Sequence, residues 1–186
     1  MDLRREPLWR PKRLLRTGSI PPRLRPWLLD TASLTERVVA ACAGTFRVEV
    51  VRQSWRRALR NEAFALDLRP EAYALVREVY LRCGETRWVY ARTVVPRASL
   101  TGANRRLTRL RARSLGAMLF ADPSLARGEV EIARVTPADK LYAHATRGLD
   151  ASPAELWARR TRYALHAQPL LVSEIFLPSL PAASWT

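Results

Sequence analysis

The chain has 186 residues and a mass of 21.2 kDa, a size that predicts one domain with a substantial core. Hydrophobic residues make up 48% of it and charged residues 26%, which excludes a disordered or collagen-like protein. The net charge is +15, but only two of the 32 basic residues, Lys12 and Lys140, are lysine. Such a skew is typical of a general coding bias toward arginine, so we expect no nucleic-acid partner, although a basic nucleic-acid binder remains an alternative.

Other classes of site find little support in the sequence. Cys42 and Cys83 are too few and too far apart for a disulfide framework or a Cys-x-x-Cys metal site, so we expect two small buried side chains. His144 and His166 have no ligand spacing, and we expect neither a metal nor a cofactor. No stretch approaches the roughly 18 apolar residues of a membrane span. The N-terminus has no apolar signal core, so we expect a cytoplasmic protein.

Residues 1–22 contain four prolines and several arginines, and we expect a basic tail outside the core. At most, this tail would make weak contact with an anionic membrane surface. The ordered domain is expected to span 23–186 and to open with a short helix at 24–29. Ser33 and Glu36 then have the capping-box spacing, which predicts a second helix that ends at Gly44.

Alternation of apolar and polar residues predicts six strands further along the chain. They are expected at 45–51, 73–83, 87–96, 129–135, 157–167 and 170–177. Turns are expected at Gly84-Glu85 and at Gln168-Pro169, helices at 104–110 and 114–120, and a surface insertion at 136–155. The pattern predicts an α+β fold with a single six-stranded antiparallel sheet and helices packed on one face.

Three charged residues fall among apolar side chains of the expected strands. Arg77 shares a strand face with Leu75 and Val79, Glu174 shares one with its apolar neighbours, and Arg92 lies between Tyr90 and Val94. A charge on a buried face requires a partner, because its desolvation is costly. One solution is a buried salt bridge between Arg77 and Glu174; the other is a closed cavity in which they contact a ligand.

Several segments resemble the chorismate lyase family, and they occur in the family's order over roughly 24–178. They are WLLD at 27–30 with SLT at 33–35, LVREV at 75–79, ARTVVP at 91–96, SLGAMLF at 114–120, VEIAR at 130–134 and LLVSEIFLP at 170–178. No single segment is diagnostic, but the ordered set is specific. The family often has methionine where this chain has Leu34.

The resemblance implies a monomer with a ligand site sealed under helical flaps, and a lyase that converts chorismate to 4-hydroxybenzoate and pyruvate for ubiquinone biosynthesis. It implies no metal and no cofactor. By the family pattern, Arg77 would bind the ring carboxylate together with backbone groups at Leu34 and Leu115. Glu174 would face the ring hydroxyl, and Arg92 would contact the enolpyruvyl carboxylate.

A non-catalytic sensor of aromatic acids is the alternative within the same fold, because effector-binding domains of some bacterial transcription regulators resemble it. Such regulators carry a winged helix ahead of the sensor, and residues 1–22 are too short to form one. We therefore expect the enzyme.

Overall fold

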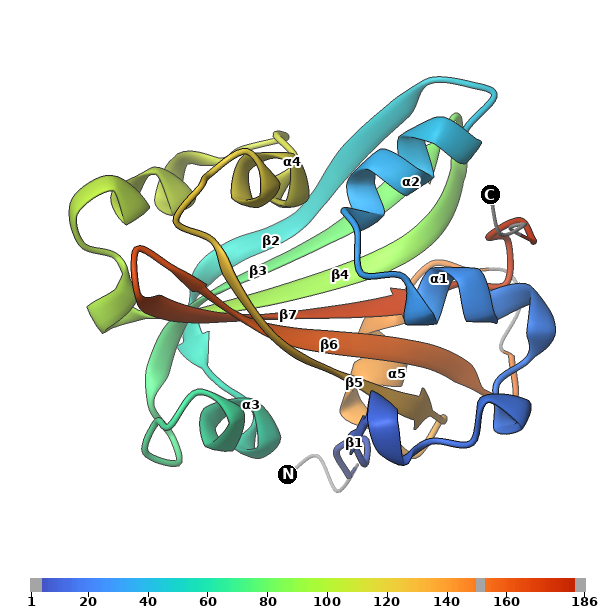
Figure 1. Ribbon diagram of the computed structural model, residues 1–186, viewed down its shortest axis with the longest axis horizontal. Helices are drawn as coiled ribbons and strands as arrows, with labels where there is room; N and C mark the ends of the chain where they lie inside the picture. The colour runs from blue at the N-terminus through green and yellow to red at the C-terminus, as the bar shows by residue number, and fades with distance from the viewer. Residues whose placement is uncertain (1–4, 150–152, 183–186) are drawn as a thin grey trace.

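The structure is a computed structural model that describes residues 5–149 and 153–182. The chain consists of strands and short helices (Figure 1). The strands are β1 (Arg10–Pro11), β2 (Phe46–Arg57), β3 (Tyr73–Cys83), β4 (Thr86–Pro96), β5 (Ala126–Val135), β6 (Leu156–Leu165) and β7 (Gln168–Phe176). The α-helices are α1 (Arg25–Leu29), α2 (Leu34–Ala41), α3 (Arg60–Ala65), α4 (Leu115–Phe120) and α5 (Lys140–Ala145). The 3-10 helices are η1 (Lys12–Leu14), η2 (Thr17–Ser19), η3 (Pro22–Leu24), η4 (Arg97–Ser99) and η5 (Gly102–Arg109).

All strands belong to one antiparallel sheet in the order β1-β5-β6-β7-β4-β3-β2. The fold class is therefore α+β as predicted, but the sheet has seven strands and not six. The six expected strands are all present, with ends that differ by a few residues. The last hairpin turns at His166 and Ala167, which both have positive φ, two residues before the expected Gln168-Pro169 turn.

The seventh strand lies in the segment that we expected to be a tail. β1 pairs with β5, and the surrounding segment buries the side chains of Trp9 and Ile20. The Lys12 ammonium donates to the carbonyl of Leu29 at 2.8 Å, so even the basic groups of this segment contact the domain. Apolar side chains between the prolines provide enough burial to hold the segment against the sheet edge.

Helices cover both faces of the sheet, whereas the sequence predicted them on one. α1, α2, η5 and α4 lie on the first face, and α3 and α5 lie on the second (Figure 1). Part of the second face is apolar, since alternate residues of the central strands, such as Tyr80, Tyr90 and Ile175, form a buried cluster with α5. A sheet whose central strands are apolar on both faces must be covered on both sides.

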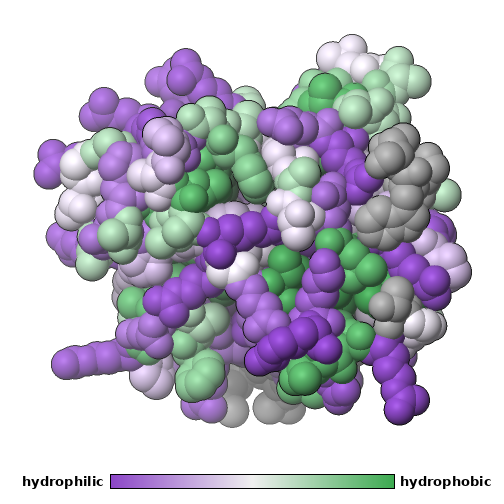
Figure 2. Space-filling model, viewed as in Figure 1, coloured by the Kyte–Doolittle hydropathy of each residue, from purple (hydrophilic) through white to green (hydrophobic). Residues whose placement is uncertain are grey.

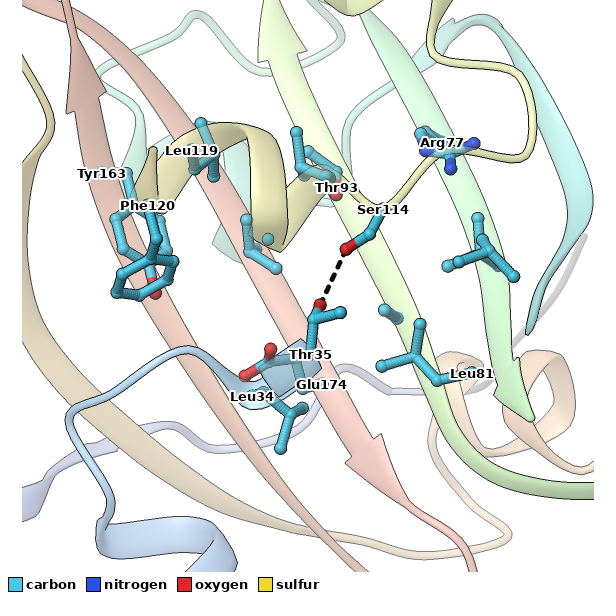
Figure 3. A pocket seen from close by; sticks show the side chains of 16 residues that line it. Leu34, Thr35, Arg77, Leu81, Thr93, Ser114, Leu119, Phe120, Tyr163 and Glu174 are labelled. Atoms are coloured by element: carbon cyan, nitrogen blue, oxygen red, sulfur yellow. Dashed lines mark hydrogen bonds between the residues drawn. The ribbon is translucent and has the colours of Figure 1, made fainter. Parts of the chain in front are cut away.

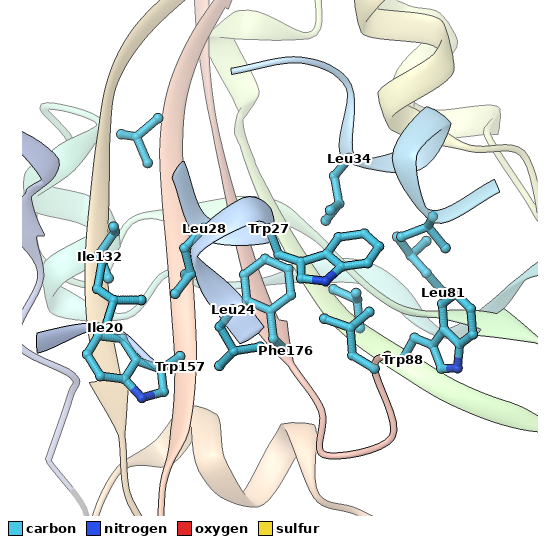
Figure 4. Packing of buried hydrophobic residues seen from close by; sticks show 14 of the residues in the cluster. Ile20, Leu24, Trp27, Leu28, Leu34, Leu81, Trp88, Ile132, Trp157 and Phe176 are labelled. Atoms are coloured by element: carbon cyan, nitrogen blue, oxygen red, sulfur yellow. The ribbon is translucent and has the colours of Figure 1, made fainter. Parts of the chain in front are cut away.

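The largest cluster of the core lies between α1 and the first face of the sheet (Figure 4). Trp27 and Leu28 of α1 are fully buried there against Trp157 and Phe176 of the sheet. The Trp27 indole also donates to the carbonyl of Pro181 at 3.0 Å, which anchors the chain after β7. This packing fixes the position of α1 and of the loop that follows it.

Cys42 and Cys83 form a disulfide, so our expectation of two free buried thiols is wrong. Their Cα atoms are 5.6 Å apart although 41 residues separate them in sequence. Cys42 follows α2 directly, and Cys83 is the last residue of β3. Spacing alone did not reveal the pair, because the approach depends on α2 folding back over the β3–β4 hairpin.

The region 136–155 is not simply a surface insertion. It contains α5, whose Leu141, Tyr142 and Ala145 are buried against the second face. Residues 150–152 of this region lie outside the described residues.

Hydrophilic side chains project around the face shown in Figure 2, with smaller hydrophobic areas between them. None of the helices in the part of the chain that the structure describes has the length and hydropathy needed to cross a membrane.

Candidate functional site

A cavity lies between the first face of the sheet and the helices α2 and α4 (Figure 3). It brings together four of the residues that the sequence singled out: Arg77, Glu174, Leu34 and Leu115. Its walls are mainly apolar, as in most small-molecule sites, with a few polar groups at defined positions. The sheet provides the floor and the two helices provide the roof.

The register of the sheet sets the spacing between the two charged residues. Arg77 on β3 pairs with Thr93 on β4, and Glu174 on β7 pairs with Ala91, two residues along β4. Two strand spacings across and two residues along place the Cα atoms of Arg77 and Glu174 roughly 12 Å apart. Both side chains lie on the same face of the sheet and line the same cavity.

Arg77 is buried and has no acidic partner among the described residues. One terminal nitrogen, Nη2, donates to the carbonyl of Arg113 at 2.9 Å, and the other, Nη1, is buried and has no hydrogen-bond partner in the part of the chain that the structure describes. Burial lowers the pKa of Arg77 to about 10, so the guanidinium is still charged at neutral pH. A desolvated cation with a free donor is a site for an anion such as a carboxylate.

Glu174 does not pair with Arg77, so the buried salt bridge that we considered as an alternative is not formed. Its Oε2 instead accepts from Nε of Arg159 at 2.5 Å. Burial disfavours the charged guanidinium of Arg159, but the Glu174 carboxylate outweighs this effect and raises the pKa of Arg159. No hydrogen bond to Glu174 Oε1 is formed by the described residues, and the side chain lines the cavity.

The roof consists of the first turns of α2 and α4, which meet over the cavity. Each helix begins after a serine, Ser33 or Ser114, whose hydroxyl accepts from a backbone N–H three residues on. The hydroxyl of Ser114 also lies 2.8 Å from that of Thr35, and this hydrogen bond joins the two helices (Figure 3). Gly116 permits the contact, since a Cβ there would lie 2.6 Å from Thr35 Oγ1.

Leu34 and Leu115 are the first residues of these two helices, and both line the cavity. The backbone N–H groups of a first helical turn have no acceptor within the helix. The backbone amides of both leucines therefore lie where a hydrogen bond to a ligand in the cavity can be donated.

The floor of the cavity between Arg77 and Glu174 is formed by short or apolar side chains. Val79, Ala91 and Thr93 lie there on neighbouring strands. Ala91 lies directly beside Glu174, where its small side chain leaves space above the sheet.

Arg92 is not at this site. It points to the second face of the sheet, where its guanidinium pairs with Glu62 at 2.7 Å and Glu78 at 2.7 Å. Burial would raise the pKa of Glu78, but His144 and Arg92 outweigh it and lower that pKa to about 2. Strand alternation explains the difference, because the side chain of Arg92 must lie opposite to those of Ala91 and Thr93.

Arg159 is the residue at this site that the sequence reasoning missed. It is 1% exposed and shares a strand face with Trp157 and Tyr163, both of which are buried. The signal was a charge among apolar side chains, the same one that identified Arg77 and Glu174. Arg159 and Arg160 are adjacent in sequence, so strand alternation places one of them on each face. The pair therefore resembled a general arginine excess, and the charge on the buried face was not recognised.

Among the residues that the structure describes, no group of three or more His, Cys, Asp or Glu side chains could hold a metal ion. The polar side-chain groups that line the cavity are hydroxyls, one carboxylate and one guanidinium.

Sequence comparisons with known proteins agree on one family. A family model described as chorismate lyase matches residues 4–183. A probable chorismate pyruvate-lyase of Nitrosospira multiformis is 44% identical over 163 residues, which cover 88% of this chain and 91% of the relative. Proteins with the same description from Pseudomonas aeruginosa and Methylococcus capsulatus are 40% and 41% identical, covering 88% and 84% of this chain and 88% and 96% of those relatives.

Solved structures of lower sequence similarity share the fold. PhnF from Mycobacterium smegmatis superposes with a TM-score of 0.58 at 17% identity, covering 85% of this chain and 68% of that one. The ligand-binding domain of a putative GntR-family transcriptional regulator from Bordetella bronchiseptica gives a TM-score of 0.51 at 14% identity, covering 77% of this chain and 90% of that one. At such identities the likeness concerns the fold alone.

Proposed function

Because the chain belongs to the chorismate lyase family, we propose that its cavity binds chorismate and eliminates pyruvate from it to give 4-hydroxybenzoate. The observation that carries the proposal is the buried Nη1 of Arg77, which has no hydrogen-bond partner among the described residues and belongs to a side chain that lines the same cavity as the carboxylate of Glu174. A para-substituted ring with a carboxylate and a hydroxyl matches this arrangement of one cation and one acceptor.

The proposed binding mode places the ring carboxylate at Arg77 and the ring hydroxyl at Glu174. Backbone amides at Leu34 and Leu115 complete the carboxylate end from the roof. The ring then lies on Ala91 and Thr93, within the part of the floor that has the least side-chain volume. Both ends of the ring are fixed before reaction, which is the positional contribution to catalysis that such a site can make.

The reaction breaks the ether bond between the ring and the enolpyruvyl group, and the ring carbon that bears the hydroxyl loses its proton. The enolpyruvyl oxygen keeps the electron pair of the broken bond, and a proton is added to its methylene carbon to give pyruvate. The ring becomes aromatic, so the reaction is favourable and no oxidant, reductant or co-substrate is consumed. Fixed charges at the two ends of the ring stabilise the charge that moves during bond cleavage.

Arg92 has no direct role in this proposal, since its guanidinium is buried on the far face of the sheet with two carboxylates. We retain it as a structural residue and assign the enolpyruvyl carboxylate no contact with it.

We propose that a ligand enters the cavity when the roof moves. Leu34 and Leu119, on α2 and α4, are 4% and 2% exposed and close the cavity from above. We propose that α2 and α4 act as flaps, and that parting them breaks the Thr35–Ser114 hydrogen bond. The same closure would retain the product, so product release rather than chemistry would limit turnover.

The test is to mix purified protein with chorismate in the absence of metal and nucleotide and to measure 4-hydroxybenzoate and pyruvate. Equimolar products, with a large loss in Arg77→Met, are expected. Arg82→Met is the matched control, because Arg82 lies on the same strand but on the opposite face, paired with Glu49. Binding of 4-hydroxybenzoate without turnover would instead support the aromatic-acid sensor, and neither binding nor turnover would refute both.

A further inference from the structure

We propose that Arg159 is a positioning residue that keeps Glu174 ionised, with one carboxylate oxygen directed at the substrate hydroxyl. The inference rests on the proposed function, since it concerns the hydroxyl end of the same cavity. It assigns a role to a buried residue that does not itself line the cavity.

In the contact between Arg159 and Glu174, the two carboxylate oxygens of Glu174 have different surroundings. Oε2 is occupied by Nε of Arg159 at 2.5 Å, and Oε1 has no partner among the described residues. β6 and β7 are neighbours, and Arg159 pairs with Glu174 in their register, so the contact is set by the sheet and not by a mobile loop. One oxygen is therefore held in place, and the other remains available as an acceptor.

Arg159 is also fixed from its other end. Its Nη1 donates to the carbonyls of Trp27 and Asp30, each at 2.9 Å. Trp27 is on α1, fully buried in the main cluster, and Asp30 begins the loop that leads to the roof helix α2. The guanidinium of Arg159 thus links the carboxylate of Glu174 to the backbone that leads into the roof helix α2.

These contacts determine the form in which Glu174 acts. A guanidinium does not lose its proton in proteins, so a neutral Glu174 would leave Arg159 as a buried cation without a counter-charge. Glu174 is therefore a hydrogen-bond acceptor for the ring hydroxyl and not a general acid. The proton that reaches the departing enolpyruvyl group comes from another source.

A comparison of two ligands separates this role from a general contribution to folding. 4-Hydroxybenzoate has the hydroxyl that Glu174 would accept from, and benzoate lacks it; both retain the carboxylate for Arg77. The ratio of their dissociation constants is measured by calorimetry for the wild type, Arg159→Met and Arg159→Lys. Arg160→Met is the matched control, because Arg160 is buried next in sequence but pairs with Glu131 on the opposite face.

We expect the wild type to prefer 4-hydroxybenzoate and Arg159→Met to reduce that preference by about tenfold or more, as for loss of a hydrogen bond to a charged group. Arg159→Lys keeps a cation near Glu174 and should retain more of the preference for 4-hydroxybenzoate than Arg159→Met does. Arg160→Met should retain all of this preference. A purely structural role would weaken both ligands equally, and an unchanged ratio would overturn the inference.

If Arg159→Met does not fold, the wild type alone still tests the idea. An ionised Glu174 predicts a ratio that is constant from about pH 5.5 to pH 8, a range above the ordinary carboxylic-acid pKa. A preference that grows as Glu174 takes up a proton in this range would show a neutral carboxyl and refute the proposal. A wild type that turns over chorismate but fails these tests removes only the role of Arg159, whereas one that binds neither ligand removes the proposed function as well.

Discussion

Breaking the disulfide between Cys42 and Cys83 is expected to destabilise the protein substantially. The bond closes a loop across a sequence separation of 41 residues. Loop-closure entropy in the unfolded chain then predicts a loss of about 4 kcal/mol in the free energy of unfolding when the bond is removed. Such a loss is a large part of the stability of an ordinary domain.

Urea unfolding followed by tryptophan fluorescence is a suitable assay, because the core contains Trp27 and Trp88. The double variant Cys42→Ser/Cys83→Ser should unfold at a urea concentration about 2 M lower than the oxidised wild type, for a typical slope near 2 kcal/mol per M. A reductant should have the same effect on the wild type and none on the variant. Because disulfides form in oxidising surroundings, the wild type must be purified without reductant.

Thiol alkylation and mass spectrometry provide the control, since the oxidised protein should have no reactive thiol. The reasoning would be refuted if the bond is present and its reduction changes the free energy of unfolding by less than about 1 kcal/mol. That result would show that the unfolded chain already holds the two segments close together.

Three other substitutions test separate parts of the structure. Ala91→Leu should fill the floor of the cavity and weaken 4-hydroxybenzoate binding in calorimetry by about tenfold or more, since overpacking costs about 1–3 kcal/mol; unchanged affinity would contradict the binding mode. Arg92→Met leaves Glu62 and Glu78 buried without their cation and should lower the free energy of unfolding by about 3–5 kcal/mol, while the folded protein keeps its ligand affinity. A loss of affinity at unchanged stability would return Arg92 to the site. The pKa of Glu78 is lowered to about 2, so its contribution to stability is complete above the ordinary carboxyl pKa and is lost as the pH falls toward 2. Urea midpoints should therefore fall less between pH 5 and pH 2 in Glu78→Gln than in the wild type, and equal slopes would exclude this role.

The resemblance to a family and the strand pattern together located most of the cavity before the structure was available. Arg77 and Glu174 were identified because a charge in an apolar alternation is costly wherever the strand is buried, whatever its neighbours are. The capping-box spacing of Ser33 and Glu36 also carries a local signal, which is why the start of α2 was placed correctly.

Period-two alternation assigns residues to the two faces of a strand but does not say which face holds a ligand. Arg92 looked like Arg77 in sequence, and only the layers around the sheet distinguish them. One is buried beneath α2 and α4 with a free donor, and the other is paired with Glu62 on α3. The second layer of helices is itself a consequence of tertiary packing, because α3 and α5 are short and have weak sequence signals.

The sequence by itself determined the α+β class, the six long strands, the two helix starts and the charges that must find partners, since each depends on local periodicity or on the cost of desolvation. Tertiary structure decided the partners: Glu174 with Arg159, Arg92 with Glu62 and Glu78, and Cys42 with Cys83. Each of these pairs joins different elements of the fold. Strand order and the path of α2 over the sheet set those contacts, and neither is encoded in the spacing of residues along the chain.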